Sequence, residues 1–279
     1  MNLNAYKLYQ VFKYAVYAFL TLNIYWFFRI EWAASAHRFT DGVGLSDLIE
    51  GFASTIDTAA WVGLLLMFEL ETYILDDRHF TRRVTATLHT LRLLCYTFIV
   101  YAFYGYLTKL LFLFGATPLA DAVDLCRLAG ERWSYAVDLD EYVTVTAANC
   151  SELSSAREFM RFQGLDAVVD LRGYVDIVRL AWVDVINSGV WLGVVLVLEI
   201  DVRLQERNRL RGIPLKLSTA SKYLFYPTLF LAAVYWGVKG DFVGFWDAFL
   251  WLVAFVFIER NVFEWRLETE GVPDDAVPA

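Results

Sequence analysis

Three observations predict an all-α integral membrane protein with six transmembrane helices. Of the 279 residues, 58% are hydrophobic and 17% aromatic, with a mean hydropathy of +0.44, whereas soluble domains are about 45–50% apolar. Six stretches are long and apolar enough to cross a bilayer core, which takes about 20 residues. A four-position pattern recurs in three of these stretches and groups the six into three repeated two-helix hairpins.

The predicted spans divide the chain into four regions. In order, they lie at residues 13–32, 53–75, 90–114, 180–202, 220–238 and 243–262. The fifth contains Pro227, which lacks a backbone donor and is expected to kink its helix. The regions are helices 1–3 (1–115), a small extracytoplasmic segment (116–178), helices 4–6 (179–263) and an acidic cytoplasmic tail (264–279).

The distribution of lysine and arginine predicts that both termini are cytoplasmic. Basic residues gather in the loops on the side of the termini, as in 203–216, with four arginines and one lysine. The short loops opposite contain only Arg29, Arg38 and Lys239. Cytoplasmic loops of membrane proteins carry an excess of Lys and Arg. We therefore expect an integral protein of a bacterial inner membrane, with the acidic segment 116–178 outside the cytoplasm.

The cysteines agree with this orientation. Cys126 and Cys150 both lie in the external segment, where an oxidising compartment favours a disulfide between them. No CxxC motif or histidine cluster accompanies them, so the sequence predicts no metal site there. Within the segment, residues 121–132 and 158–172 have helical patterns and residues 142–146 resemble a strand.

The second, fourth and sixth spans share four positions at spacings of 4, 8 and 2 residues. These positions hold Asp or Asn, then Trp, then Glu, then an acid or Asn: Asp57, Trp61, Glu69 and Glu71; Asn187, Trp191, Glu199 and Asp201; Asp247, Trp251, Glu259 and Asn261. The odd-numbered spans each begin near a basic residue that precedes a tyrosine by 12 or 13 positions: Lys13, Arg92 and Lys222. The pattern predicts a threefold hairpin repeat.

The three repeated glutamates are expected at one depth in the membrane. At about 1.5 Å per helical residue, each lies about 18 Å along its helix from the first position of the pattern. A carboxylate there costs about 2.5 kcal/mol or more, so it must face the protein interior, water or a cation. In one interpretation Glu69, Glu199 and Glu259 line a cation or proton path, with Asp57, Asn187 and Asp247 at its outer mouth. In the other, they form ion pairs with Lys13, Arg92 and Lys222 that lock the helices together, and the outer acids cap their helices.

Two functional hypotheses follow. The first is a channel or transporter for a cation, proton or small polar solute, and the second is a non-catalytic integral subunit or scaffold of a larger membrane complex. The histidines, His37, His79 and His89, are too scattered for haem or zinc sites, and no catalytic motif is present. No cofactor is expected, and the net charge of −8 argues against nucleic acid. The expected partners are membrane lipids and further copies or other membrane subunits.

Overall fold

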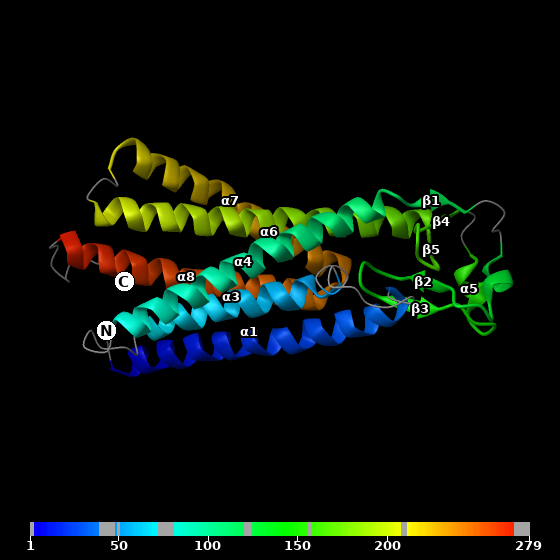
Figure 1. The fold of residues 1–279 in the computed structure, drawn as a ribbon, viewed down its shortest axis with the longest axis horizontal. Coiled ribbons are helices and arrows are strands. Elements are labelled where there is room, and N and C mark those ends of the chain that lie inside the picture. The colour runs from blue at the N-terminus through cyan, green and yellow to red at the C-terminus, as the bar shows by residue number, and fades with distance from the viewer. Residues whose placement is uncertain are drawn as a thin grey trace. The chain divides into compact units, whose positions relative to one another are not determined.

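The computed structural model describes residues 3–38, 48, 51–71, 81–119, 124–155, 158–207 and 211–270, with the side chains of 3–6, 38, 205–206 and 259–270 outside that description. Over this part of the chain the protein is mostly helical, with seven α-helices and one five-stranded sheet (Figure 1).

Six long helices lie at the six predicted positions. Their bounds are α1 Leu3–Arg38, α3 Ala53–Glu69, α4 Arg82–Leu113, α6 Leu171–Glu206, α7 Ile213–Lys239 and α8 Phe242–Glu270. Helix α7 contains Pro227 without ending there. Three side chains mark helix starts by accepting a backbone N–H of the first turn: Thr81 for α4, Asp170 for α6 and Asp241 for α8.

Three of these helices, among the described residues, are long and apolar enough to cross a membrane. They are Lys7–His37 of α1, Arg82–Leu113 and Leu171–Leu204 of α6. The apolar part of α8, Phe242–Ile258, is shorter, and α3 has 17 residues. Part of the predicted second span, residues 72–75, lies outside the described chain. Composition thus supports three of the six predicted membrane spans.

The all-α prediction is wrong for the segment between α4 and α6, which contains a sheet. We call residues 117–170 the sheet module. Its strands are β1 Thr117–Pro118, β2 Ser134–Ala136, β3 Tyr142–Thr144, β4 Phe159–Arg161 and β5 Ala167–Asp170. They follow the order β1-β4-β5-β2-β3, with β2 and β5 parallel and the other pairs antiparallel.

Local sequence predicted the secondary structure of this module only in part. The strand expected at 142–146 is confirmed by β3. The helix expected at 158–172 is wrong, because strands β4 and β5 flank a turn at Gly164, whose φ of 75° favours glycine. The helix expected at 121–132 is, in its described part, a single 3-10 turn over Leu125–Leu128.

A small apolar core and a disulfide hold the module together. The disulfide joins Cys126 and Cys150 with a Cα–Cα distance of 4.8 Å, which confirms the predicted pairing. It connects the 3-10 turn to the short helix α5, Cys150–Leu153. The buried core comprises Leu125, Trp133, Val145, Cys150, Phe159 and Val168.

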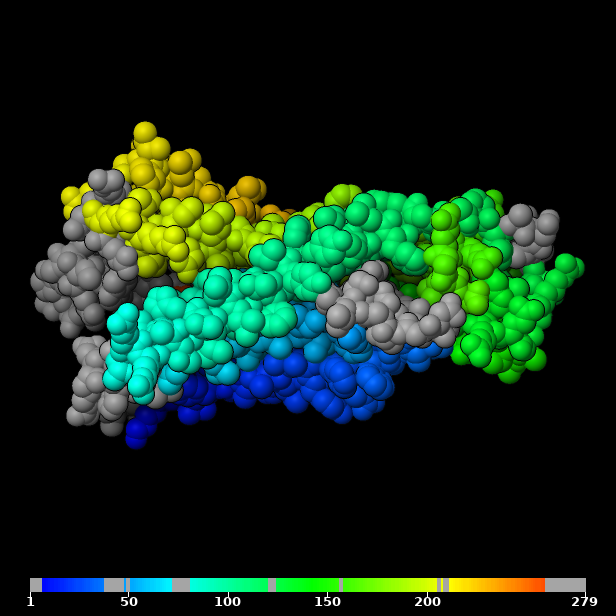
Figure 2. Space-filling model, in the orientation of Figure 1, coloured from blue at the N-terminus to red at the C-terminus, as the bar shows by residue number. Residues whose placement is uncertain are grey.

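Residues 24–225 form one compact unit, which contains the sheet module. In it α3 packs against α4, and α4 against α6. The module lies against the end of α4 (Figure 2). There the rings of Phe112 and Phe162 stack with centroids 6.1 Å apart. Tyr174 of α6 also donates to the Leu113 carbonyl at 3.0 Å. These contacts fix the module at one end of the unit, which we call the module end.

Residues 1–23 and 226–279 form the second compact unit. It combines the first part of α1, the last part of α7, and α8. Edge-to-face aromatic contacts join α1 to α8, with Phe257 meeting both Tyr9 and Phe12 at centroid distances of 5.3 and 5.7 Å. Asn23 also donates to Asp247 Oδ1 at 2.8 Å.

Candidate functional site

The repeated tryptophans share the same environment in all three copies. Trp61, Trp191 and Trp251 are buried, with 8%, 6% and 6% of their surface exposed. The rings of Trp61 and Trp191 contact each other across α3 and α6 at a centroid distance of 6.0 Å. One turn earlier, Asp57, Asn187 and Asp247 are half-buried. The first two positions of the pattern therefore lie on inward faces of α3, α6 and α8.

Glycines provide a second correspondence between the first two copies. Gly63 and Gly193 each follow a repeated tryptophan by two residues. A Cβ on Gly63 would lie 3.1 Å from Cys95 of α4, and a Cβ on Gly193 would lie 2.9 Å from Phe225 of α7. Cys95 follows Arg92 by three residues, and Phe225 follows Lys222 by three. The α3–α4 and α6–α7 contacts therefore share one register, as a repeat requires.

Two of the three predicted bases are ion-paired in an equivalent way. Arg92 of α4 pairs with Glu71, which follows α3, and Lys222 of α7 lies 3.9 Å from Asp201 Oδ2 of α6. Ser218 also donates to Asp201 at 2.5 Å. In both copies the acid is the residue two positions after the repeated glutamate. Each pair joins the end of one predicted hairpin to the start of the next, and we call these two pairs the locks.

The repeated glutamates have other surroundings. Glu199 Oε1 accepts a hydrogen bond from the Tyr96 hydroxyl of α4 at 2.7 Å, and its other oxygen lies 3.6 Å from the exposed Arg203. Glu69 is buried, with 3% of its surface exposed, and Lys13 is fully buried. Glu259 lies within α8, and its side chain is outside the described residues.

Tyr96 was missed by the sequence analysis, although a signal was available. A tyrosine follows the basic residue by four positions in all three odd-numbered spans, as Tyr17 after Lys13, Tyr96 after Arg92 and Tyr226 after Lys222. Residues four apart share one helix face. Arg92 and Tyr96 of α4 therefore bind acids of two neighbouring copies, Glu71 after α3 and Glu199 of α6.

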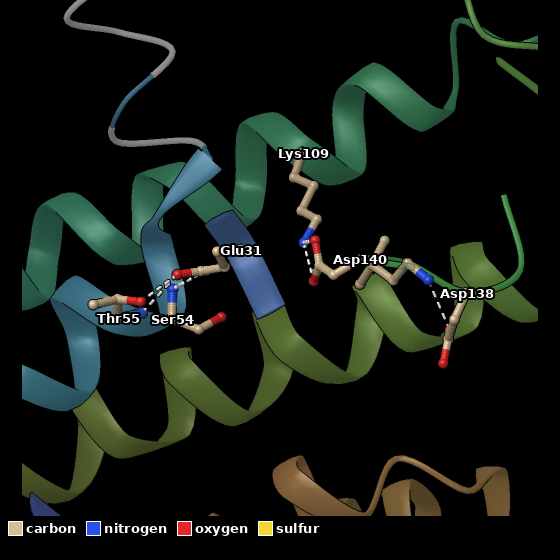
Figure 3. A network of polar contacts seen from close by, with 7 residues as sticks. Glu31, Ser54, Thr55, Lys109, Asp138 and Asp140 are labelled. Atoms are coloured by element: carbon tan, nitrogen blue, oxygen red, sulfur yellow. Dashed lines mark hydrogen bonds and ion pairs between the residues drawn. The ribbon is translucent and has the colours of Figure 1, made fainter. Parts of the chain in front are cut away.

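A second polar network lies at the module end, as Figure 3 shows. Glu31 of α1 accepts from the backbone N–H groups of Ser54 and Thr55 at 2.8 and 3.1 Å, and from the Thr55 hydroxyl at 2.5 Å. The N-cap residue of α3, Phe52, has no polar side chain. Glu31 therefore supplies from another helix the cap that α3 lacks.

Lys109 connects this network to the sheet module. Its ammonium donates to both carboxylate oxygens of Asp140 at 2.6 Å (Figure 3). The Lys109 side chain is 5% exposed and the Asp140 side chain 22%. His37 of α1 also contacts the module, through a 2.8 Å hydrogen bond with Ser134 and a stacked contact with Tyr142. The β2–β3 hairpin is thus attached to two helices, α1 and α4.

One hydrogen bond inside the module shifts two pKa values. The Tyr135 hydroxyl donates to Asp170 Oδ2 at 2.6 Å. Burial, together with this bond and the nearby carboxylate charge, raises the pKa of Tyr135 to about 12. Burial acts to raise the pKa of Asp170, but hydrogen bonds from Tyr135, Gly173 and Arg172 outweigh it and lower that pKa below 3.8.

Comparisons with protein-family models, curated proteins and solved structures found no match to this chain. Within the described residues no group of three or more His, Cys, Asp or Glu side chains could hold a metal ion. The contacts above define a helical protein with candidate membrane spans, repeated carboxylates and an attached disulfide-bonded module.

Proposed function

We propose that this chain is a polytopic membrane protein that conducts or transports a cation, a proton or a small polar solute. All six long helices cross the membrane as three repeated hairpins, with both termini in the cytoplasm. Three helices of spanning length and composition support this arrangement. The disulfide supports an oxidising compartment around the sheet module, and the excess of Lys and Arg in the opposite loops supports the same orientation. A bacterial inner membrane meets both conditions.

The repeated glutamate and the acid two positions after it make different contacts, and this difference supports a transport role for the glutamates. The locks pair Arg92 with Glu71 and Lys222 with Asp201, each the acid two positions after a repeated glutamate. Glu199 accepts instead from the neutral hydroxyl of Tyr96. Residues two positions apart on a helix point in different directions. In α6 the second acid, Asp201, can therefore stabilise the helix packing while Glu199 is bound by a neutral hydroxyl and can serve another task.

That task is reversible binding of a proton or cation. Glu199 can take up a proton without leaving a buried base unpaired, because Tyr96 is neutral and Arg203, the base near its other oxygen, is exposed to solvent. A carboxylate in a buried ion pair cannot do so, because protonation would leave the base charged and desolvated. Ionisable side chains inside membrane segments mark ion and proton pathways. Glu69, Glu199 and Glu259 are the residues we assign to this path.

Flux in proteoliposomes tests the assignment. The Glu69→Gln, Glu199→Gln, Glu259→Gln triple variant is compared with the wild type, and gel filtration establishes that both are folded. We expect proton or cation flux in the wild type and at least a tenfold loss in the variant. Equal flux in both proteins would remove the glutamates from the path.

A second candidate is a non-catalytic subunit of a larger membrane complex. Large apolar side chains on α7 are strongly exposed, among them Ile213 at 74%, Tyr223 at 79% and Val238 at 79%. Lipid or another membrane subunit would cover such a surface. Absence of flux from the wild type, together with a membrane protein of fixed stoichiometry retained during gentle purification, would favour this candidate over transport.

A further inference from the structure

Five oxygen-bearing side chains lie on the parts of α3, α4 and α6 toward the module end. They are Asp57 of α3, Tyr106 of α4, and Asp184, Asn187 and Ser188 of α6, and we call them the oxygen cluster. The Tyr106 hydroxyl lies 3.5 Å from Asp57 Oδ2. Tyr106 belongs to a buried cluster with Ala53 of α3 and Ala102 of α4, and Val185 of α6 packs against that cluster.

Asp184, Asn187 and Ser188 lie on the side of α6 that faces the other helices of the unit. Asp184 and Ser188 are one turn apart and share a helix face with the buried residues Ile177, Leu180 and Ala181. Asn187 lies four residues before Trp191, and the ring of Trp191 contacts Trp61 of α3. Asp57 likewise precedes Trp61 by four. Asp57 and Asp184 both lie within electrostatic range of the Tyr106 hydroxyl.

Two polar atoms of the cluster have unused hydrogen-bonding capacity. Ser188 is 3% exposed, and within the described part of the chain its hydroxyl has no hydrogen-bond partner. The Asn187 Oδ1 atom is also buried and, among the same residues, has no hydrogen-bond partner. Buried polar atoms in proteins are nearly always hydrogen-bonded or bind water or an ion. These two atoms therefore point to a ligand between the helices.

The charges nearby determine which ligand fits. Asp57 and Asp184 contribute two carboxylates. Lys109, one turn from Tyr106 on α4, is neutralised by both oxygens of Asp140. Glu31, also near the tyrosine, adds a third carboxylate that caps α3. The surroundings are therefore negative and offer oxygen atoms, which suits a hard cation.

We propose that Asp57, Tyr106, Asp184, Asn187 and Ser188 form a binding site for a monovalent hard cation such as Na⁺. The two carboxylates offset its charge, and the hydroxyl and amide oxygens replace part of its hydration shell. A tightly held divalent ion usually takes more carboxylates, and Glu31, the third carboxylate nearby, is already bound to the start of α3. That the site binds a cation does not depend on the proposed function. That it serves as the entry site for transported cations does rest on the proposed function.

Equilibrium binding tests the site on the full-length protein in detergent micelles. Isothermal titration calorimetry and thermal unfolding are measured in NaCl, KCl and CaCl₂, with choline chloride at equal ionic strength as the reference. The variants are Asp57→Asn and Ser188→Ala. The control is Asp176→Asn, which alters an exposed carboxylate of α6 that pairs with Arg179.

We expect saturable Na⁺ binding and a Na⁺-dependent rise in unfolding temperature. Ser188→Ala should weaken binding about tenfold, Asp57→Asn should abolish it, and Asp176→Asn should match the wild type. Lack of a Na⁺ effect beyond choline would overturn the proposal, as would a wild-type response in Asp57→Asn. A response to Ca²⁺ alone would overturn the monovalent assignment.

The two proposals can fail separately. Flux that depends on the repeated glutamates, in a protein without Na⁺ binding, would refute the oxygen cluster and leave transport intact. Na⁺ binding in a protein without flux would leave the site intact and refute transport. The triple glutamine variant should lose flux and keep Na⁺ binding, because none of its three substitutions lies in the oxygen cluster.

Discussion

Replacing Glu31 tests whether α3 depends on a cap supplied by another helix. Glu31 is 3% exposed and accepts three hydrogen bonds at the start of α3, two from backbone N–H groups and one from the Thr55 hydroxyl. Hydrogen bonds to a charged group contribute about 1.5–3 kcal/mol each, and loss of an N-cap costs about 1 kcal/mol. Such effects are not additive within one network.

We expect Glu31→Ala to lower the free energy of unfolding by about 3–4 kcal/mol, because it leaves two N–H groups without an acceptor. Glu31→Gln keeps one acceptor oxygen, so we expect a loss of about 2 kcal/mol. Thr55→Val removes one hydrogen bond at nearly constant volume and should cost about 1 kcal/mol.

Unfolding in mixed micelles of increasing dodecyl sulfate content, followed by circular dichroism, measures these differences. Asp176→Asn is the matched control, because its carboxylate lies 3.7 Å from Arg179 at an exposed site, and it should change stability by less than about 0.5 kcal/mol. The reasoning is refuted if Glu31→Gln is as stable as the control, or if Thr55→Val costs as much as Glu31→Ala.

Three further predictions concern the glutamate path and the sheet module. Tyr96→Phe removes the donor to Glu199, so the pH dependence of flux should shift while the folded fraction measured by gel filtration stays the same. The pKa of Tyr135 is raised to about 12, so its hydrogen bond to Asp170 should contribute fully to stability below about pH 10 and be lost as the pH rises through 12. Unfolding measured as a function of pH should show that loss in the wild type and not in Tyr135→Phe. The disulfide joins two cysteines that are 24 residues apart, and its reduction should lower the free energy of unfolding of the module by about 3 kcal/mol. Limited proteolysis should then cut the module and spare α4 and α6.

The long helices could be predicted because their signal is local and repeated. Each apolar stretch exceeds the length of a strand, so helices were expected at positions that the structure confirms. The disulfide was predictable because Cys126 and Cys150 are the two cysteines outside the expected spans. The sheet could not be predicted from the sequence because its strands have only two to four residues. Pairing between distant segments stabilises such strands and overrides a local helical pattern.

The partners of the charged residues could not be predicted from spacing alone. Glu69 and Glu71 are two residues apart and point in different directions, and only the packing of α3 against α4 selects Glu71 for Arg92. Asp201 is selected by Lys222 in the same way. The cap that Glu31 provides joins residues more than 20 positions apart, so no local pattern signals it. The repeated tyrosine is different, because its four-residue spacing from the base is visible in the sequence.

We assign helix packing to the second acid of the first two copies, Glu71 and Asp201, and transport to the repeated glutamate. Comparing Glu199→Gln with Asp201→Asn tests that separation on one turn of α6. Flux per folded protein in proteoliposomes is measured together with unfolding in mixed micelles. The account predicts that Glu199→Gln loses flux at nearly unchanged stability, while Asp201→Asn loses stability and keeps its flux within twofold. Equal flux in Glu199→Gln and the wild type, with the larger loss of stability in that variant, would contradict it.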